Sequence, residues 1–203
     1  RTPALKQMMR VLVSLPGSVS LYQGEELGLP QASIPQDIPH DRLRDPVSVT
    51  RGPHASRDGS RTPIPWHDEG SHAGFSHADE AYLPVPESHR EKAVNVQERD
   101  PDSMLNFMRG LMAWRKNQPA LLNGTTAVMN IQGSSVLAFV RRSEGQTLMC
   151  AFNLKAQPVT FNPAECLDQA TADKLSFGKD ASIALEPYGA AFAGERPAIT
   201  PQP

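Results

Sequence analysis

The sequence predicts an α/β segment followed by a small all-β domain. The opening residues read as a helix, a turn and a short buried strand, an order typical of α/β architecture with parallel strands. After about Gly124 the chain breaks into short apolar runs separated by turn residues, which is typical of an antiparallel sandwich. A length of 203 residues, 39% of them hydrophobic, is enough for one or two globular domains with a real core.

The first predicted helix begins at Thr2, which can cap it with Pro3 in the first turn. Apolar residues then recur at helical spacing, namely Leu5, Met8, Met9, Leu12 and Val13. Pro16-Gly17 ends this helix. The run from Ser18 to Tyr22 follows as a buried strand, with Tyr22 expected in the core.

Residues 24–100 are rich in Pro, Gly, His, Asp and Arg and show little periodicity. A loop region of this length is usually functional or disordered, and its arginines and aromatic residues favour a functional role. A second helix follows Pro101, capped by Asp102 or Ser103, and Asn117-Gln118-Pro119 ends it. One face of this helix is traced by Met104, Leu105, Met108, Leu111, Met112 and Arg115.

Six strands are predicted in the last part of the chain, at residues 125–131, 135–142, 147–153, 158–161, 183–186 and 190–193. Gly133-Ser134 and Glu144-Gly145 are turn signals between the first three. We therefore expect residues 121–203 to form an antiparallel β-sandwich domain that folds by itself.

Composition argues against several classes of partner. A formal charge of −2 and a pI near 6.3 give no field that would attract nucleic acid or an anionic membrane. The sequence has no apolar run of membrane-spanning length and no signal peptide. Cys150 and Cys166 match no metal-ligand spacing and are too few for a disulfide framework, which favours a reducing, cytoplasmic location. Because the chain lacks an initiating Met and opens directly into a helix, we expect it to be the C-terminal piece of a longer protein.

Two adjacent carboxylates, Glu25 and Glu26, stand between two glycines in the stretch LYQGEELGLP. In an extended segment neighbouring side chains point to opposite faces, so these two cannot both act on one bond. A retaining glycosidase needs two carboxyl groups about 5 to 5.5 Å apart on either side of the scissile bond. We therefore expect a scaffolding role, with one carboxylate buried in hydrogen bonds or ion pairs beneath a site and the other at its rim.

Several motifs in order carry a resemblance to a known family. Residues 15–28 (LPGSVSLYQGEELG) resemble the eighth barrel strand of the α-glucosidase branch of glycoside hydrolase family 13, the α-amylase family. Residues 43–46 (LRDP) resemble the loop after that strand, and residues 57–66 (RDGSRTPIPW) resemble the family's Arg-Asp-x-x-Arg-Thr-Pro-x-x-Trp motif. His72-Ala73-Gly74-Phe75 and the helix end Trp114-Arg115-Lys116 follow in the expected order. The match covers residues 1 to about 120, and the β-rich remainder resembles the family's C-terminal domain.

The resemblance implies a fold and an activity. Residues 1–120 would be the C-terminal end of a (β/α)8 TIM barrel, with helix 7, strand 8, a long loop and helix 8, and residues 121–203 would be the antiparallel β-sandwich. The intact enzyme would hydrolyse or transglucosylate α-linked glucosides such as maltose, isomaltose or short oligosaccharides, with retention and without a cofactor. The family's catalytic carboxylates lie upstream of this chain. The resemblance therefore implies no catalytic residue here, no activity of the chain alone, and the N-terminal part of the same enzyme as its partner.

The resemblance also implies site residues. Arg61 is expected to reach the terminal glucose, because a planar guanidinium suits sugar hydroxyls and carboxylates. Arg57 and Asp58 complete the substrate-binding set. Asp58 is expected to form a local ion pair that shapes the loop, with Arg57 or else with Arg61 as its partner. The site-supporting residues are Tyr22, Gln23, Glu25, Glu26, Trp66 and Phe75. Of these, Trp66 and Phe75 would either stack on a sugar ring or seal the loop against the barrel.

The sequence also allows other interpretations. His67, His72 and His77 recur every five residues, but this spacing does not place ligands on one helix face, so no metal site is predicted. One alternative function is a sucrose- or maltose-rearranging relative of the same branch. A non-catalytic homologue used as an interaction scaffold is a second, although the Arg-Asp-x-x-Arg loop argues against it. A free-standing carbohydrate-binding sandwich at residues 121–203 is a third, although its strands lack a row of aromatic residues.

Overall fold

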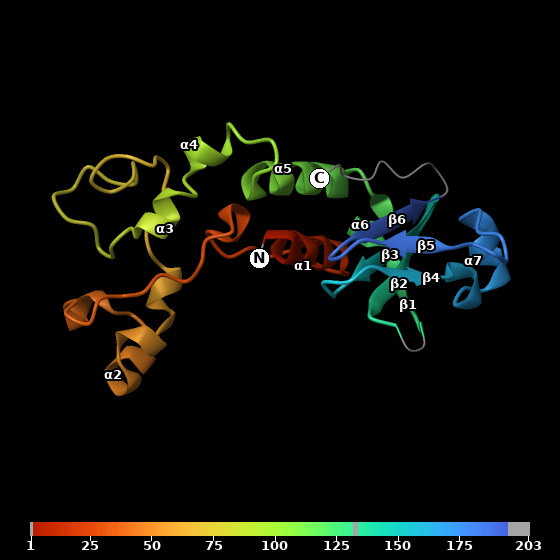
Figure 1. Ribbon diagram of the computed structural model, residues 1–203, viewed down its shortest axis with the longest axis horizontal. Coiled ribbons are helices and arrows are strands. Elements are labelled where there is room, and N and C mark those ends of the chain that lie inside the picture. The colour runs from red at the N-terminus through yellow and green to blue at the C-terminus, as the bar shows by residue number, and fades with distance from the viewer. Residues whose placement is uncertain (1, 132–133, 195–203) are drawn as a thin grey trace. The chain divides into compact units, whose positions relative to one another are not determined.

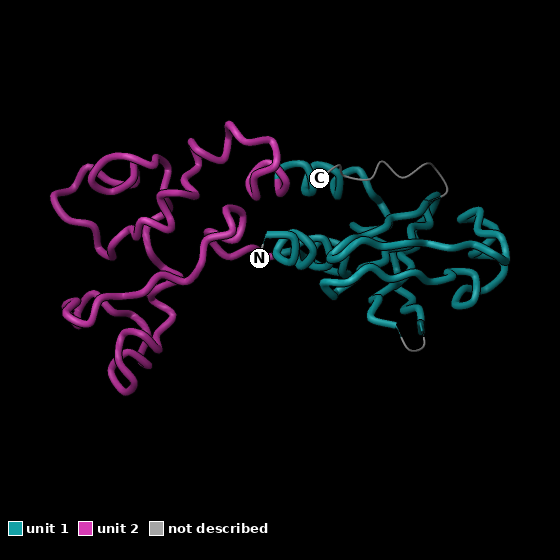
Figure 2. Tube along the Cα trace, in the orientation of Figure 1, with its two compact units in different colours: residues 1–19, 109–203 teal, residues 20–108 magenta. Residues whose placement is uncertain are grey.

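The computed structural model describes residues 2–131 and 134–194, and the chain divides into two compact units (Figure 1; Figure 2). We call residues 1–19 together with 109–203 the sheet unit, and residues 20–108 the loop unit. The chain leaves the sheet unit after its first helix and re-enters it within the helix at residues 104–116. Different interactions stabilise each unit.

The sheet unit contains antiparallel strands close to the predicted positions. They are β1 (Thr125–Met129), β2 (Val136–Ser143), β3 (Gln146–Asn153), β4 (Val159–Phe161), β5 (Ile183–Leu185) and β6 (Ala190–Gly194). Every boundary lies within two residues of the predicted one, and all pairings are antiparallel, which confirms that part of the prediction. Two elements between β4 and β5 were not predicted, the 3-10 helix η5 (Pro163–Glu165) and the helix α7 (Gln169–Lys174).

The strands form two sheets, one with the order β1-β2-β3-β6 and one with β4-β5. β2 and β3 are joined by the two-residue turn Glu144-Gly145, so Ser143 pairs with Gln146. Gly145 has a φ of 76°, in the left-handed region that such a turn requires and that glycine adopts without steric cost. This predicted turn is confirmed, whereas Gly133 of the other predicted turn lies outside the described residues.

Each face of the four-stranded sheet carries a buried apolar cluster. One cluster joins alternate residues of β1, β2 and β3 to the β4-β5 sheet and α7, through Met129, Ala138, Val140, Met149, Ala151, Phe161, Leu175 and Leu185. The other joins the intervening residues of the strands to α6 (Pro119–Asn123), through Ala120, Leu121, Phe139, Leu148, Cys150, Phe152 and Phe192. This division follows the alternation of side chains along a strand. The four-stranded sheet is therefore a middle layer, with the small sheet on one side and helices on the other.

Both predicted helices are confirmed, as α1 (Thr2–Ser14) and α5 (Met104–Lys116). The hydroxyl of Ser103, one of the two predicted caps, accepts from Asn106 N at 3.2 Å in the first turn of α5. The side-chain amide of Gln7 in α1 donates to the carbonyls of Asn153 at 3.2 Å and Gly189 at 2.8 Å. These contacts make α1 part of the sheet unit although it is distant in sequence.

Two buried arginines bind the C-terminal end of α6. The Arg141 guanidinium donates to the carbonyls of Ala120, Leu121 and Gly124 at 2.9 to 3.2 Å. Arg115 of α5 donates to the Leu121 carbonyl at 3.1 Å. The last carbonyls of a helix have no intrahelical partner and carry partial negative charge, so a cation suits them. The two side chains thus attach α6 to both β2 and α5.

The loop unit consists of short helical elements joined by irregular segments, as the lack of periodicity predicts. These elements are η1 (Glu25–Leu27), η2 (His40–Arg42), α2 (Val47–Arg51), η3 (Pro53–Ala55), η4 (Arg57–Ser60), α3 (Glu87–Arg90) and α4 (Val94–Gln97). None of the helices that the structure describes has the length and apolar character to cross a membrane.

The predicted buried strand at residues 18–22 is wrong for this structure. These residues pair with no strand in the described part of the chain, and Tyr22 is 51% exposed instead of lying in the core. A parallel strand gains its hydrogen bonds only from neighbouring strands. The described strands all pair antiparallel with one another and offer it no such neighbour.

Candidate functional site

The stretch QGEELG folds into a tight turn around η1. Gly24 and Gly28 flank this 3-10 helix with φ of 91° and 63°, in the left-handed region that favours glycine. Glu25 Oε2 accepts from the backbone N of Tyr22 at 3.0 Å, and Glu26 Oε2 accepts from that of Gly24 at 2.8 Å. Each carboxylate therefore satisfies a backbone donor of its own turn.

The expectation that one of Glu25 and Glu26 is buried and the other lies at the rim of the site is wrong for this structure. Both residues are half-buried, so neither is the buried member of a pair. The expectation assumed extended backbone, whereas a 3-10 helix turns each side chain back toward the preceding residues. Their role as scaffolding within the turn rests on the two hydrogen bonds to the backbone.

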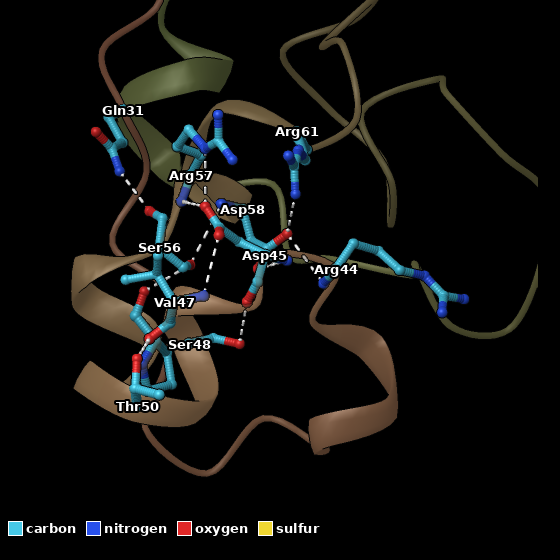
Figure 3. Close-up of polar contacts among 11 residues, drawn as sticks. Gln31, Arg44, Asp45, Val47, Ser48, Thr50, Ser56, Arg57, Asp58 and Arg61 are labelled. Atoms are coloured by element: carbon cyan, nitrogen blue, oxygen red, sulfur yellow. Dashed lines mark hydrogen bonds and ion pairs between the residues drawn. The ribbon is translucent and has the colours of Figure 1, made fainter.

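The carboxylate of Asp58 is the centre of a polar network and is completely buried (Figure 3). Its Oδ1 accepts from Arg44 N at 3.2 Å and from Arg61 Nη1 at 2.9 Å. Its Oδ2 accepts from Asp45 N at 3.1 Å. Burial raises the pKa of Asp58, but the two backbone N–H groups and the guanidinium outweigh burial, so the pKa is lowered. Asp58 is therefore an anion that orients Arg61, and it is a poor general acid near neutral pH.

A second buried carboxylate, Asp45, holds Arg57. Asp45 Oδ2 accepts from Arg57 N at 2.8 Å and from Arg57 Nε at 2.9 Å, and Oδ1 accepts from Val47 N at 3.1 Å. These bonds, led by the Arg57 backbone N–H, lower the pKa of Asp45 to about 2.

The predicted ion pair between Arg57 and Asp58 is wrong. Arg57 pairs with Asp45, and Asp58 pairs with Arg61, the second of its two expected partners, as Figure 3 shows. Adjacent side chains on the 3-10 helix η4 diverge, whereas residues three apart share a face. The i,i+3 pair Asp58–Arg61 is therefore the one that the local backbone favours.

Arg61 presents the exposed end of this network. Its side chain is 32% exposed. Hydrogen bonding to Asp58, and then to the phenol of Tyr22, raises the pKa of Arg61. A buried carboxylate thus orients the guanidinium while about a third of the side chain reaches solvent, which suits a cation that contacts a ligand. Two of the predicted site residues, Tyr22 and Arg61, are brought together here.

Close backbone contact joins the segment after QGEELG to the Arg61 loop. Ala32 N donates to Gly59 O at 2.9 Å, and a Cβ on Gly59 would lie 2.2 Å from the carbonyl oxygen of Ala32. Only glycine fits at this position. Gln23 Nε2 donates to Thr62 O at 3.5 Å, so Gln23, another predicted site residue, contacts the same loop.

The predicted aromatic residues Trp66 and Phe75 flank a separate loop. It is closed by Trp66 N, which donates to Ala73 O at 2.8 Å, and it turns through positive φ at Ala73 (50°) and Gly74 (71°). Trp66 is 49% exposed and Phe75 is 53% exposed, so neither ring is sealed within the loop unit. The contacts that orient Arg61 involve neither of these two rings.

The three regularly spaced histidines line a shallow pocket together with Asp68 and Glu69. His72 Nε2 donates to Ala78 O at 2.7 Å, so this ring holds the loop in place. Across residues 2–131 and 134–194, no group of three or more His, Cys, Asp or Glu side chains is arranged to hold a metal ion.

Several residues that hold these loops were not predicted from the sequence, namely His89, Arg90 and Asn95. They are isolated polar residues in a segment without periodicity, and their partners are distant in sequence. His89, for example, bonds Pro30, 59 residues away. Asp45, by contrast, lies in the LRDP motif that the sequence already indicated.

Family models match both parts of the chain. The model of the alpha-amylase catalytic domain matches residues 1–124, and that of the maltogenic amylase C-terminal domain matches residues 127–192. The first match alone covers more than half of the chain.

Individual relatives agree with these matches. A probable alpha-glucosidase of Rhizobium meliloti (strain 1021) is 36% identical over 191 residues, 93% of this chain and 33% of that protein. A probable oligo-1,6-glucosidase 3 of Bacillus subtilis (strain 168) is 25% identical, covering 91% of this chain and 37% of that protein. The chain thus spans about a third of the length of these relatives.

Solved structures share the same fold. An alpha-glucosyl transfer enzyme, XgtA, is 33% identical with a TM-score of 0.78, covering 97% of this chain and 36% of that chain. Trehalulose synthase MutB from Pseudomonas mesoacidophila MX-45 has a TM-score of 0.72 at 22% identity, covering 95% of this chain and 38% of that chain. The chain therefore belongs to glycoside hydrolase family 13, the α-amylase family, within its α-glucosidase and oligo-1,6-glucosidase branch, and it corresponds to the C-terminal part of such enzymes.

Proposed function

We propose that this chain is the C-terminal part of a retaining α-glucosidase whose catalytic carboxylates lie in an upstream part. We call the two parts together the intact enzyme. In this proposal residues 1–120 are helix 7, strand 8, the long loop and helix 8 of a (β/α)8 barrel, and residues 121–203 are the C-terminal β-sandwich. The catalytic-domain match over residues 1–124 supports this division. Residues 18–22, which pair with no strand in the described part of the chain, would pair with barrel strands of the upstream part.

The orientation of Arg61 by Asp58 is the observation that carries the proposal for the site. A buried carboxylate 2.9 Å from Nη1 holds the guanidinium, and about a third of the side chain, 32%, is exposed to solvent. The loop follows the proposed strand 8, and barrel enzymes bind their substrates on the face where strands end. We assign Arg61 to the terminal glucose, with Asp58 orienting it and Arg57 completing the loop through Asp45.

The remaining predicted residues support this site. The phenol of Tyr22 helps to raise the pKa of Arg61, and Gln23 donates to the Thr62 carbonyl. Glu25 and Glu26 hold the QGEELG turn. Trp66 and Phe75 are exposed in this chain, so in the intact enzyme they would either stack on a sugar ring or seal the loop against the barrel.

The mechanism follows from the family. One upstream carboxylate attacks the anomeric carbon while an upstream carboxylic acid protonates the leaving oxygen, and the covalent glucosyl intermediate then passes to water or to a sugar hydroxyl. This chain would contribute residues that bind and orient the substrate. Alone it would catalyse neither hydrolysis nor glucosyl transfer. We expect no cofactor and no nucleic-acid or membrane partner. Both cysteines are free, which supports a reducing, cytoplasmic location.

A second candidate is glucosyl transfer. It is favoured by the 33% identity and TM-score of 0.78 to a structure described as an alpha-glucosyl transfer enzyme. Hydrolysis and transfer share the glucosyl intermediate and differ only in the acceptor. The proposal therefore covers both outcomes and distinguishes them by product.

The test is to give the intact enzyme maltose, isomaltose and sucrose and to follow the first products by NMR. We expect the α-anomer of glucose to appear first, because two displacements at one carbon retain its configuration. Longer saccharides would indicate transfer, and an isomer of sucrose would indicate rearrangement. Initial release of the β-anomer would contradict a retaining mechanism, and a folded enzyme that converts no sugar would favour the scaffold alternative.

A further inference from the structure

Residues 87–97 hold several loops of the candidate site, although no residue among them was predicted to matter. Val94 N donates to Pro65 O at 2.9 Å, next to Trp66. Gln97 Nε2 donates to Leu27 O at 2.9 Å, in the turn that follows Gly24. This short segment, which carries α3 and α4, is therefore attached to loops on both sides of Arg61 in sequence.

His89 makes the most specific of these contacts. Its imidazole is buried, with Nε2 at 2.7 Å from Pro30 O and Nδ1 at 3.3 Å from Thr62 Oγ1. A carbonyl oxygen can only accept, so Nε2 carries the proton and donates to Pro30. In the neutral ring Nδ1 then has a lone pair, and it accepts from the Thr62 hydroxyl. The Pro30 carbonyl, the neutral His89 imidazole and the Thr62 hydroxyl therefore allow only one set of donors and acceptors.

Thr62 is the link between His89 and the candidate site. It is buried and directly follows Arg61 in the chain. Its carbonyl accepts from Gln23 Nε2 at 3.5 Å, while its hydroxyl is held by His89. The side chain of Arg61 is fixed at its far end by Asp58, and the adjacent backbone is fixed through Thr62.

We propose that His89 is a positioning residue for Arg61. The imidazole donates to the Pro30 carbonyl and accepts a hydrogen bond from the Thr62 hydroxyl. These two bonds fix the backbone next to Arg61, whose guanidinium reaches the sugar. The inference rests on the proposed function of Arg61 as the residue that contacts substrate. It adds a residue that touches neither the sugar nor Arg61.

Two substitutions of His89 separate its hydrogen bonds. Asn places an amide oxygen near the position of Nδ1, so His89→Asn keeps an acceptor for Thr62. Gln places an amide nitrogen near the position of Nε2, so His89→Gln keeps only the donor to Pro30. Thr62→Val removes the hydroxyl at nearly constant volume, and it tests the same bond if His89 variants fail to fold.

In the intact enzyme we expect His89→Gln and Thr62→Val each to lower kcat/KM for an aryl α-glucoside about tenfold, the usual consequence of losing one buried hydrogen bond. His89→Asn should retain several times more activity than His89→Gln. In an Arg61→Lys background the same changes should cause little further loss, because the group that they position is gone. A tenfold loss in both backgrounds would indicate a merely structural role and would overturn the proposal.

NMR of the 203-residue chain supplies a readout that does not depend on activity. The ring nitrogens of His89 should show the neutral tautomer protonated at Nε2 and a Thr62 hydroxyl protected from exchange. A tautomer protonated at Nδ1, or a ring that titrates like a free histidine, would refute the arrangement. An intact enzyme that is inactive while this tautomer is present would count against the proposed function, and not against the contact.

Discussion

The sheet unit and the loop unit are stabilised by different means. The sheet unit buries apolar side chains on both faces of one sheet. The loop unit contains buried polar groups at its fixed points, the carboxylates of Asp45 and Asp58 and the imidazole of His89, each hydrogen-bonded to other segments. Burying such groups is costly unless they are paired, but once paired they fix directions that apolar contacts cannot. The paired polar groups of the loop unit can therefore hold a side chain such as Arg61 in one orientation.

The two units also differ in ways that make them separately measurable. All six histidines lie between residues 40 and 89, within the loop unit. Each unit contains one of the two tryptophans, Trp66 in the loop unit and Trp114 in the sheet unit. Substituting one tryptophan by Phe leaves the other as a fluorescent reporter of its own unit.

Truncating the core of the sheet unit should have the largest effect on stability. Phe152 is fully buried and packs edge-on against Phe192, which itself packs against Trp114. We expect Phe152→Ala to lower the free energy of unfolding of the sheet unit by about 3 to 5 kcal/mol, measured by denaturant titration with Trp114 as reporter. Val128→Ala, at a site that is 77% exposed, should change it by less than about 0.5 kcal/mol. An equal shift with Trp66 as reporter would mean that the units unfold as one and would weaken the comparison.

Substituting Arg61, the exposed end of the polar network around Asp58, should lower activity more than it lowers stability. In the intact enzyme we expect Arg61→Lys to lower kcat/KM for glucosides by more than about tenfold, because Lys keeps the charge and loses the planar fork. Arg51→Lys is the matched control, because Arg51 is exposed and lies outside the candidate site, and it should leave kcat/KM unchanged. Unchanged kinetics in a folded Arg61→Lys enzyme would remove Arg61 from the site.

Mild acid should destabilise the loop unit selectively. Burial lowers the pKa of His89 below its ordinary value of 6.5, despite the opposing effect of the Pro30 carbonyl. As the pH falls, the unfolded state therefore binds the proton before the folded state does. The free energy of unfolding of the loop unit should then decrease below about pH 6.5, by at most about 1.4 kcal/mol per pH unit for one proton. Asp45, with a pKa of about 2, contributes stability that is lost only as the pH falls below about 3.8.

Trp66 fluorescence in a Trp114→Phe background measures this loss between pH 7 and 5. His89→Gln should flatten the slope, since Gln does not titrate. The sheet unit has no histidine, so its Trp114 reporter should show no slope in the same range. An equal slope in both units would contradict the assignment to His89.

Limited proteolysis should sharpen the boundary between the regions. We expect the first cuts in the loop unit, for example in the exposed stretch at residues 66–71. A resistant core of about the size of the C-terminal sandwich should remain. The compact sheet unit also includes α1, through the hydrogen bonds of Gln7. Gln7→Ala should therefore loosen α1 from the core without exposing the strands, as mass spectrometry of the fragments would reveal. Equal protection of both units would contradict this expectation.

Sequence patterns predicted the sheet unit better than the loop unit for a physical reason. Periodic burial leaves a local signature, which located α1, α5 and the strands of both sheets. The strand at residues 18–22 failed because a parallel strand depends on neighbours that the described chain does not provide. The swapped ion pairs failed for a similar reason, because Arg57 and Asp45 meet across 12 residues of irregular chain. Arg61 was predicted as a substrate-binding residue from the resemblance of its motif, and not from periodicity.

Assay of an aryl α-glucoside tests the central claim most directly. Retaining hydrolysis requires a nucleophilic carboxylate and a carboxylic acid on opposite sides of the glycosidic bond. In this chain Glu25 and Glu26 bond their own turn, and Asp45 and Asp58 are ion-paired. We predict no hydrolysis above background by the pure 203-residue chain and full activity by the intact enzyme. Turnover by the pure chain, abolished by Glu25→Gln or Glu26→Gln, would contradict the account.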